Sequence, residues 1–261
     1  MGISLSTARV IAPLSYAINF VVQMYGMNSK PNMLDIHNKR FAAFSPWAWA
    51  IPIFFSGQQI IQLIWLWRLV VKGATSSVGE VERQAMVQYA PYYALGNLCI
   101  AAWLPVWANR LDLSFIFVAI NSITQLVYVL RGLPPRTSAT LLTHLNAKTF
   151  GGIGLLDFVH NLSAGFFVGV GPNLLAKLVT PLASVMLAIA SDDWMLGACV
   201  TYDLFALALG QALGPPSITG GHAGPVLGGK SWPTLLTLYA GGTGALTLAR
   251  FLRGPAGGIK I

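Results

Sequence analysis

The sequence predicts an all-α protein, a polytopic transmembrane bundle of seven or eight helices. Of its 261 residues, 55% are hydrophobic and 9% are charged, against about 25% charged in an average soluble domain. It contains several apolar runs of about 18–20 residues, the length that a helix needs to cross a hydrocarbon core of about 30 Å. The polar stretches between these runs are too short for a soluble domain, so residues 1–261 are expected to form a single integral membrane domain.

The apolar runs define the expected spans in chain order. They cover residues 10–26, 42–67, 89–108, 113–130, 150–170, 173–190, 194–213 and 232–250. The first run is interpreted as a span because it lacks a clear small-residue cleavage site. The second carries Gln58, Gln59 and Gln62, whose amides need partners in lipid, so this helix is expected to pack inside the bundle. If the last run does not cross, seven spans remain.

Turn and charge signals separate the spans. The polar stretches 68–88 and 131–148 are expected to be links, and Asn109–Asp112 a tight turn between two antiparallel helices. Gly171 and Pro172 break the helix before the sixth span. Asp192 and Asp193 precede the seventh, where carboxylates interact favourably with a helix N-terminus.

The distribution of Lys and Arg predicts the orientation of the bundle. With eight spans, ten of the 16 basic residues lie on the side of the two chain ends, which favours cytoplasmic termini. The net charge of +8 is scattered through short loops, as membrane topology requires, so it does not indicate nucleic-acid binding.

Ionisable side chains inside two spans are the main functional signal. Asp157, His160 and Asn161 stand at i, i+3 and i+4 in the span 150–170, which places them on one helix face. Asp203 lies in the middle of the span 194–213. A charge at bilayer depth is unfavourable by about 2.5–3.5 kcal/mol on insertion scales, so such residues are functional candidates. Both spans enter from the cytoplasmic side in this topology, so Asp157 and Asp203 could share one polar site at similar depth.

The chemistry of these residues leaves three interpretations open. A carboxyl group in an apolar pocket tends to stay protonated and can donate a proton, while a nearby imidazole can remove one at the end of a reaction. Asp157 and His160 could instead relay protons in a coupled carrier, although no convincing internal repeat supports a carrier. The third interpretation is a hydrogen-bonded pair that only holds the bundle together.

A nucleotide-binding pattern also occurs near the end of the chain. Residues 224–231 fit G-x-x-x-x-G-K-[ST], the phosphate-binding loop pattern. That loop requires a preceding strand in an α/β domain, and here a membrane span precedes it, so a flexible loop is expected. No metal-binding or cofactor-binding motif is expected to function in this chain.

One stretch with many aromatic residues resembles a known family. Residues 44–55 read FSPWAWAIPIFF and resemble the Pro-x-x-Trp-x-Phe-Pro stretch of the tryptophan-rich sensory protein/translocator protein family. Pro46, Trp49 and Pro52 match, and Ile51 stands where the family usually has an aromatic residue. Residues 103–107 are similar to the tryptophan-bearing third span of that family. This resemblance implies a helical bundle that binds or transports apolar ligands such as sterols or porphyrins.

The overall profile is similar to a second family. The chain length, the seven or eight spans, the intramembrane acids and the many aromatic residues resemble the small membrane-bound terpene cyclases of fungal meroterpenoid pathways. The resemblance implies acid-initiated cyclisation of a prenylated or epoxidised isoprenoid, an isomerase-type or lyase-type reaction that needs neither metal nor cofactor. The substrate would come from the bilayer of the endoplasmic reticulum or another endomembrane.

This reading assigns a role to each candidate residue. Asp157 or Asp203 would donate the proton, and His160 or the other aspartate would relay or accept it. The remaining candidates would orient or surround the substrate: Asn161, Trp49, Trp103 and Phe158.

Overall fold

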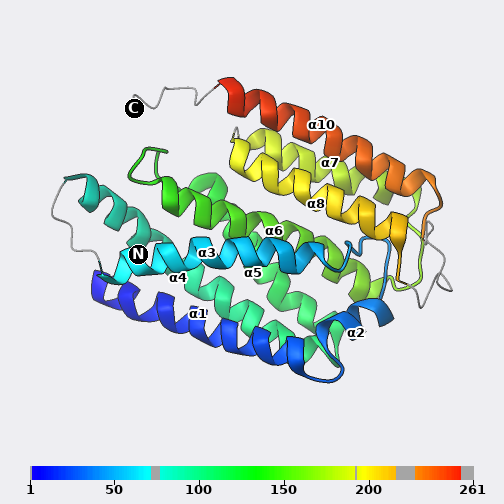
Figure 1. Cartoon of the computed structure of the whole chain (residues 1–261), viewed down its shortest axis with the longest axis horizontal. Helices are drawn as coiled ribbons and strands as arrows, with labels where there is room; N and C mark the ends of the chain where they lie inside the picture. Colours follow the sequence, from blue (N-terminus) through cyan, green and yellow to red (C-terminus); the bar gives the residue numbers. More distant parts are fainter. Residues whose placement is uncertain (1, 72–76, 192, 216–226, 254–261) are drawn as a thin grey trace.

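The computed structural model describes residues 2–71, 77–191, 193–215 and 227–253. The regular structure in these residues is helical, and the helices lie side by side in one elongated bundle (Figure 1). In chain order they are α1 (Leu5–Asn28), α2 (Met33–Lys39), α3 (Ala50–Val71), α4 (Ser77–Trp107), α5 (Leu111–Arg131), α6 (Leu141–Phe166), α7 (Leu174–Ala190), α8 (Trp194–Leu213) and α10 (Ser231–Arg253).

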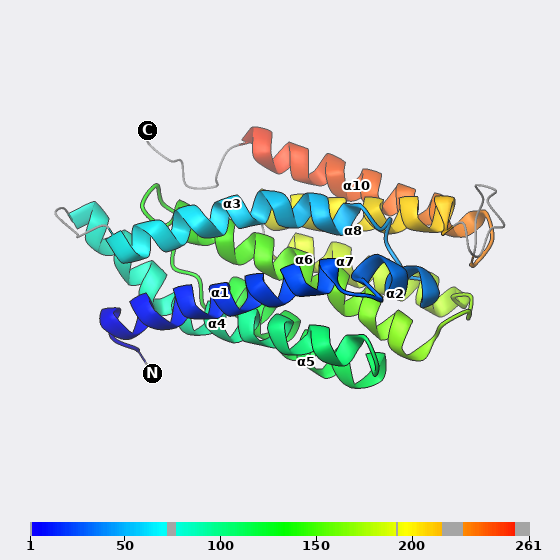
Figure 2. The same ribbon diagram turned by 60° about the horizontal axis from the view of Figure 1, so that its bottom comes forward.

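The long helices run antiparallel to their neighbours in sequence, and the start of α1 and the end of α10 lie at the same end of the bundle (Figure 1). We call this the terminal end, and we call the opposite end, which carries α2, the far end (Figure 2). Helix α6 is central, because it contacts α3, α4, α5 and α8. Helix α7 is peripheral and packs against α8 and α10.

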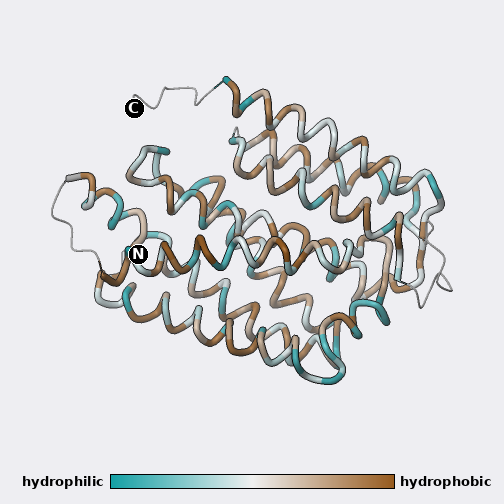
Figure 3. Tube along the Cα trace, viewed as in Figure 1, coloured by the Kyte–Doolittle hydropathy of each residue, from teal (hydrophilic) through white to brown (hydrophobic). Residues whose placement is uncertain are grey.

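The helices fit a membrane environment. In the described part of the chain, five helices are long and apolar enough to cross a bilayer: α1, α3, α5, α8 and α10. Their outer faces carry large exposed apolar side chains, among them Val21, Ile60, Ile123 and Leu238. Hydrophilic residues concentrate toward the two ends of the bundle (Figure 3). These features support an all-α membrane bundle and leave its number of crossings open.

The second expected span begins later than the sequence indicated. Helix α3 starts at Ala50, not at residue 42, and the preceding residues from Ala42 to Pro46 are buried without being helical. Pro46 explains this difference, because a proline disfavours helical geometry in the residue before it. Pro52 lies in the first turn of α3. Backbone N–H groups in the first turn have no partner within the helix, so the missing N–H of proline loses no hydrogen bond.

Two expected links are partly helical. Helix α4 begins at Ser77 and includes most of the stretch 68–88. Its Glu82 forms an ion pair with Arg68 of α3 at 2.6 Å. Helix α6 begins at Leu141, inside the expected link 131–148. Interhelical ion pairs allow charged residues to continue both helices, which hydropathy alone does not indicate.

Buried polar side chains hold the helices together in pairs. Gln62 of α3 accepts a hydrogen bond from the Tyr93 hydroxyl of α4 at 2.6 Å, which confirms that this face of α3 packs inside. The Tyr89 hydroxyl donates to Gln125 of α5 at 3.0 Å. Gln58 is buried as well, and neither its oxygen nor its nitrogen has a partner among the described residues.

Candidate functional site

The two intramembrane aspartates come together in the middle of the bundle. Asp157 on α6 and Asp203 on α8 are near enough for their charges to interact. Asp203 is 3% exposed, and neither of its oxygens has a hydrogen-bond partner in the described chain. Asp157 is partly exposed. Two carboxyl groups whose charges interact in apolar surroundings ionise together only against an electrostatic penalty, which favours retention of a proton by the pair.

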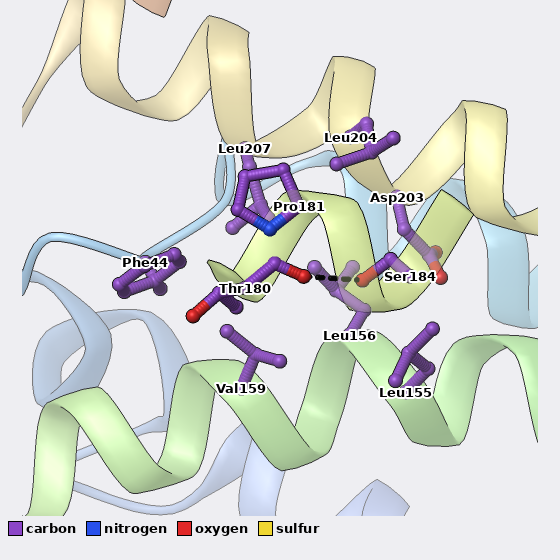
Figure 4. Close-up of a pocket in the computed structure, with 10 residues that line it drawn as sticks. All are labelled: Phe44, Leu155, Leu156, Val159, Thr180, Pro181, Ser184, Asp203, Leu204 and Leu207. Atoms are coloured by element: carbon purple, nitrogen blue, oxygen red, sulfur yellow. Dashed lines mark hydrogen bonds between the residues drawn. The ribbon is translucent and has the colours of Figure 1, made fainter. Parts of the chain in front are cut away.

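Asp203 lies at the wall of a small apolar cavity between α6, α7 and α8 (Figure 4). Its carboxyl group points toward Ser184 of α7 and Leu155 of α6 (Figure 4). The Ser184 hydroxyl donates to the Thr180 carbonyl at 3.2 Å, a bond within its own helix. The cavity has a volume of about 10 Å³, which is room for about one water molecule.

The non-helical segment 41–49 closes the cavity toward the far end. Phe44 is the member of this segment that lines the cavity. Side chains from two other helices satisfy the backbone: Gln211 of α8 donates to the carbonyls of Ala42 and Ser45 at 3.0 Å, and the Trp232 indole of α10 donates to the Ala43 carbonyl at 2.8 Å. Irregular backbone at membrane depth requires such internal partners.

A close approach of two backbones makes this arrangement possible. The Trp47 amide donates to the Ala206 carbonyl of α8 at 2.8 Å. A Cβ atom on Gly210 would lie 2.4 Å from the Ser45 oxygen and from the Pro46 carbonyl carbon, so a side chain at this position would push the segment away from α8. Close packing against α8 therefore holds this segment in place as part of the cavity wall.

His160 lies against a second histidine, which comes from the stretch between the first two expected spans. His37 is on α2, and its ring centroid is 5.2 Å from that of His160. Both imidazoles hydrogen-bond to the backbone of segment 41–49, His37 at Pro46 and His160 at Phe44. The usable sequence signal was the Asn32–Asp35 capping box, which starts a short helix before His37, but no pattern indicated its contact with α6.

Burial controls the ionisation of His37. The side chain is 7% exposed, and its burial lowers the imidazole pKa to about 4, although the hydrogen bond to the Pro46 backbone acts in the opposite direction. His37 is therefore neutral near pH 7 and can accept a proton.

The predicted neighbours of the acids have different positions. Asn161 is buried, its Nδ2 donates to the Asp157 carbonyl at 2.8 Å, and its Oδ1 accepts from the Trp103 indole at 2.9 Å. Phe158 contacts Phe115 of α5, with ring centroids 5.1 Å apart. Trp49 is 58% exposed. Asn161 and Trp103 thus adjoin the acidic face of α6, whereas Trp49 and Phe158 are not among the cavity-lining residues.

A separate ionic cluster lies at the terminal end. The Asp193 Oδ2 atom forms ion pairs with Lys148 at 2.6 Å and with Arg136 at 2.8 Å. Its Oδ1 atom accepts a hydrogen bond from the Met195 amide at 2.7 Å. Asp193 is thus the predicted N-cap of α8, and Asp192 lies outside the described residues. Burial opposes ionisation of Asp193, but the bond from Lys148 and the nearby positive charges hold its pKa below the usual value.

Two further kinds of site, for a metal ion and for a nucleotide, concern other parts of the described chain. In the described ranges, no group of three or more His, Cys, Asp or Glu side chains is arranged to hold a metal ion. The described part of the phosphate-loop pattern, residues 227–231, leads into α10, and the Gly228 carbonyl accepts a hydrogen bond from Lys177 at 2.8 Å. Residues 224–226 of that pattern lie outside the described residues.

The chain was compared with known proteins at three levels. No protein-family model matches it, and neither the curated proteins nor the solved structures contain a match.

Proposed function

We propose that this chain is a membrane enzyme that cyclises a prenylated or epoxidised isoprenoid by protonating it. The observation that carries the proposal is the buried carboxyl group of Asp203, which lies at the wall of an apolar cavity and has no hydrogen-bond partner in the described chain. Its charge interacts with that of Asp157 on the neighbouring helix α6. A buried, unpartnered polar group is unfavourable by about 1–3 kcal/mol, so a structural role alone does not account for it.

The proposed reaction needs only a proton donor, a shaped pocket and a base. The Asp203 carboxyl O–H protonates the epoxide oxygen, the C–O bond breaks, and the alkene electron pairs of the chain attack the resulting carbocation. A base then removes a proton from the final cation, so the product is an isomer of the substrate. Asp157 returns the proton to Asp203, and Asn161 holds the α6 backbone at Asp157 in place.

The substrate must enter through a movement of the cavity wall. The cavity has room for about one water molecule, far less than an isoprenoid chain. Helix α7 is the wall that can move. Among the described helices, only α8 and α10 pack extensively against it. Pro181 lies inside α7 and lines the cavity, and an interior proline removes one helical hydrogen bond.

The proposed enzyme spans the membrane eight times, with α4, α6 and α7 crossing alongside the five more apolar helices. Charged residues of α4 and α6 are neutralised by interhelical ion pairs, and α7, with 17 residues, has the minimum length for a crossing. The proposed location is the endoplasmic reticulum or another endomembrane, where membrane-dissolved isoprenoids are available.

A product assay with matched variants tests this function. The chain in lipid nanodiscs is supplied with an epoxyfarnesyl-bearing phenol, and the extract is analysed for an isomer of equal mass and different retention time. Asp203→Asn should lower turnover about 10²–10⁴-fold, the usual contribution of a general acid. Asp112→Asn removes an exposed carboxyl group on α5 and should leave turnover unchanged. Equal turnover of native protein and Asp203→Asn would contradict the proposal.

The second candidate function is the binding or transport of an apolar ligand. It is favoured by the small volume of the inner cavity and by an outer groove of about 270 Å³ between α7 and α10, which has an apolar lining. A protein that only binds should take up the phenol saturably and leave it chemically unchanged. Asp203→Asn should then change the Kd for the phenol little. Saturable binding without any isomer formation would select this function over the enzyme.

A further inference from the structure

Two buried histidines lie between the interior acids and the far end of the bundle. His160 is one helical turn from Asp157 on the same face of α6, at i+3. Its ring is 5.2 Å from that of His37, centroid to centroid, with the planes tilted by 47°. His37 belongs to α2, whose next residues are the half-buried Asn38 and the exposed Lys39 and Arg40. The two imidazoles therefore connect the acidic site with the surface of the far end.

We propose that His160 and His37 are the route by which protons pass between the Asp157–Asp203 pair and the water at the far end. The inference deepens the proposed function and rests on its protonated carboxyl pair, but it does not depend on the cyclisation chemistry. In each transfer His160 accepts a proton at Nδ1, becomes an imidazolium and releases a proton from the same nitrogen, because its other nitrogen is held by the Phe44 backbone. No net charge remains in the bundle after a proton has passed.

The hydrogen bonding of His160 favours a route over a structural pair. Its Nδ1 is buried and has no partner in the part of the chain that the structure describes. A pair that served only to hold α2 against α6 would leave this nitrogen unsatisfied, which is unfavourable by about 1–3 kcal/mol. A nitrogen that must alternately accept and release a proton has to be free of a permanent donor.

The surroundings keep the route neutral at rest. The charged side chains of α2 and of its C-cap are Asp35, Lys39 and Arg40, and all three are exposed. On α6 and α8 the ionisable neighbours are Asp157 and Asp203, and segment 41–49 contributes its backbone. Burial holds the pKa of His37 at about 4, so a proton that reaches this ring is lost readily to water at neutral pH.

Infrared spectroscopy in lipid nanodiscs tests the route without any substrate. A protonated carboxyl group has a C=O band that shifts when its hydrogen is exchanged for deuterium, and Asp203→Asn identifies the band of Asp203 by its loss. After rapid mixing with D₂O, His37→Gln and His160→Gln should slow the shift of this band about tenfold to a hundredfold, because proton transfer by positioned groups contributes factors of this order. His144→Gln is the matched control, since His144 lies at the terminal end and hydrogen-bonds to the Pro134 carbonyl.

Chemical rescue separates a proton route from a structural role. In His37→Ala, added imidazole should restore the exchange rate, whereas a structural defect would persist. Exchange at the native rate in both glutamine variants overturns the proposal, and so does a slowed exchange that imidazole leaves unchanged. If no carboxyl band disappears in Asp203→Asn, the pair holds no proton, and both the proposed acid and the route fail. Slowed exchange without any cyclised product supports the route and removes the cyclase.

Discussion

Helix α8 carries two buried aspartates in opposite situations. Asp193 at its N-terminus accepts two cations and a backbone amide. Asp203 in its middle has no hydrogen-bond partner among the described residues and lies beside another carboxyl group. Both are nearly inaccessible to solvent, so burial does not distinguish them. Their partners do: two cations and a backbone amide hold the carboxylate of Asp193, whereas no hydrogen-bond donor in the described chain holds a charge on Asp203.

The comparison separates two kinds of buried acid in a helical bundle. A buried carboxylate with complete partners is held in its charged form, and its removal leaves the partner cations unpaired. A buried carboxyl group without partners is held in its neutral form, and its removal relieves an unfavourable arrangement. Variants at the two positions should therefore change stability in opposite directions.

Asp193→Asn should have the largest effect on stability. The change leaves Lys148 buried without a carboxylate, and breaking a buried ion pair in this way destabilises a protein by about 3–5 kcal/mol. Unfolding by denaturing detergent measures the loss, with Asp35→Asn at an exposed ion pair as the control. The double variant Asp193→Asn with Lys148→Met should recover much of the loss. A small effect of Asp193→Asn alone would mean that the cluster contributes little.

His37 should contribute to the pH dependence of stability between pH 4 and 6.5. The pKa of His37 is about 4 in the folded protein and near 6.5 when unfolded, so the unfolded state binds the extra proton between these values. The stability that depends on neutral His37 is present above pH 6.5 and is lost as the pH falls toward 4. The shift corresponds to about 3 kcal/mol.

His37→Gln should flatten the stability profile over this pH range. Asn38→Gln, which changes a neighbouring residue that does not titrate, serves as the control. The contribution of Asp193, whose pKa is lowered, should persist to more acidic pH and disappear as the pH falls through that lowered value. An unchanged slope in His37→Gln would assign the pH dependence to other groups.

Asp203→Leu should have the smallest effect on stability, and with the opposite sign. Leucine removes an unpartnered polar group from an apolar cavity wall, so we expect stability to rise by about 1–3 kcal/mol. The same detergent titration measures it. A loss of stability as large as that of Asp193→Asn would show that Asp203 has a structural partner, and the contrast between the two aspartates would disappear.

Much of the local structure could be predicted because it depends on neighbouring residues. The Asp193 cap of α8, the inward face of α3 with Gln62 and the shared face of Asp157, His160 and Asn161 follow from helix geometry. The start of α3 at Ala50 was missed because an apolar run continues through the non-helical segment before it. Hydropathy measures burial, and this segment is buried without being a helix.

Composition and apolar run length alone determined that the chain is an all-α membrane protein with acids inside its helices. Only the tertiary structure decided which acids have partners. Asp193 meets Lys148 across 45 residues of sequence, and His37 meets His160 from the stretch between the first two expected spans. The physical reason is that helix periodicity determines which residues share a face, whereas the contacts between faces depend on how the helices pack. Those contacts determine whether a buried group keeps its charge or its proton.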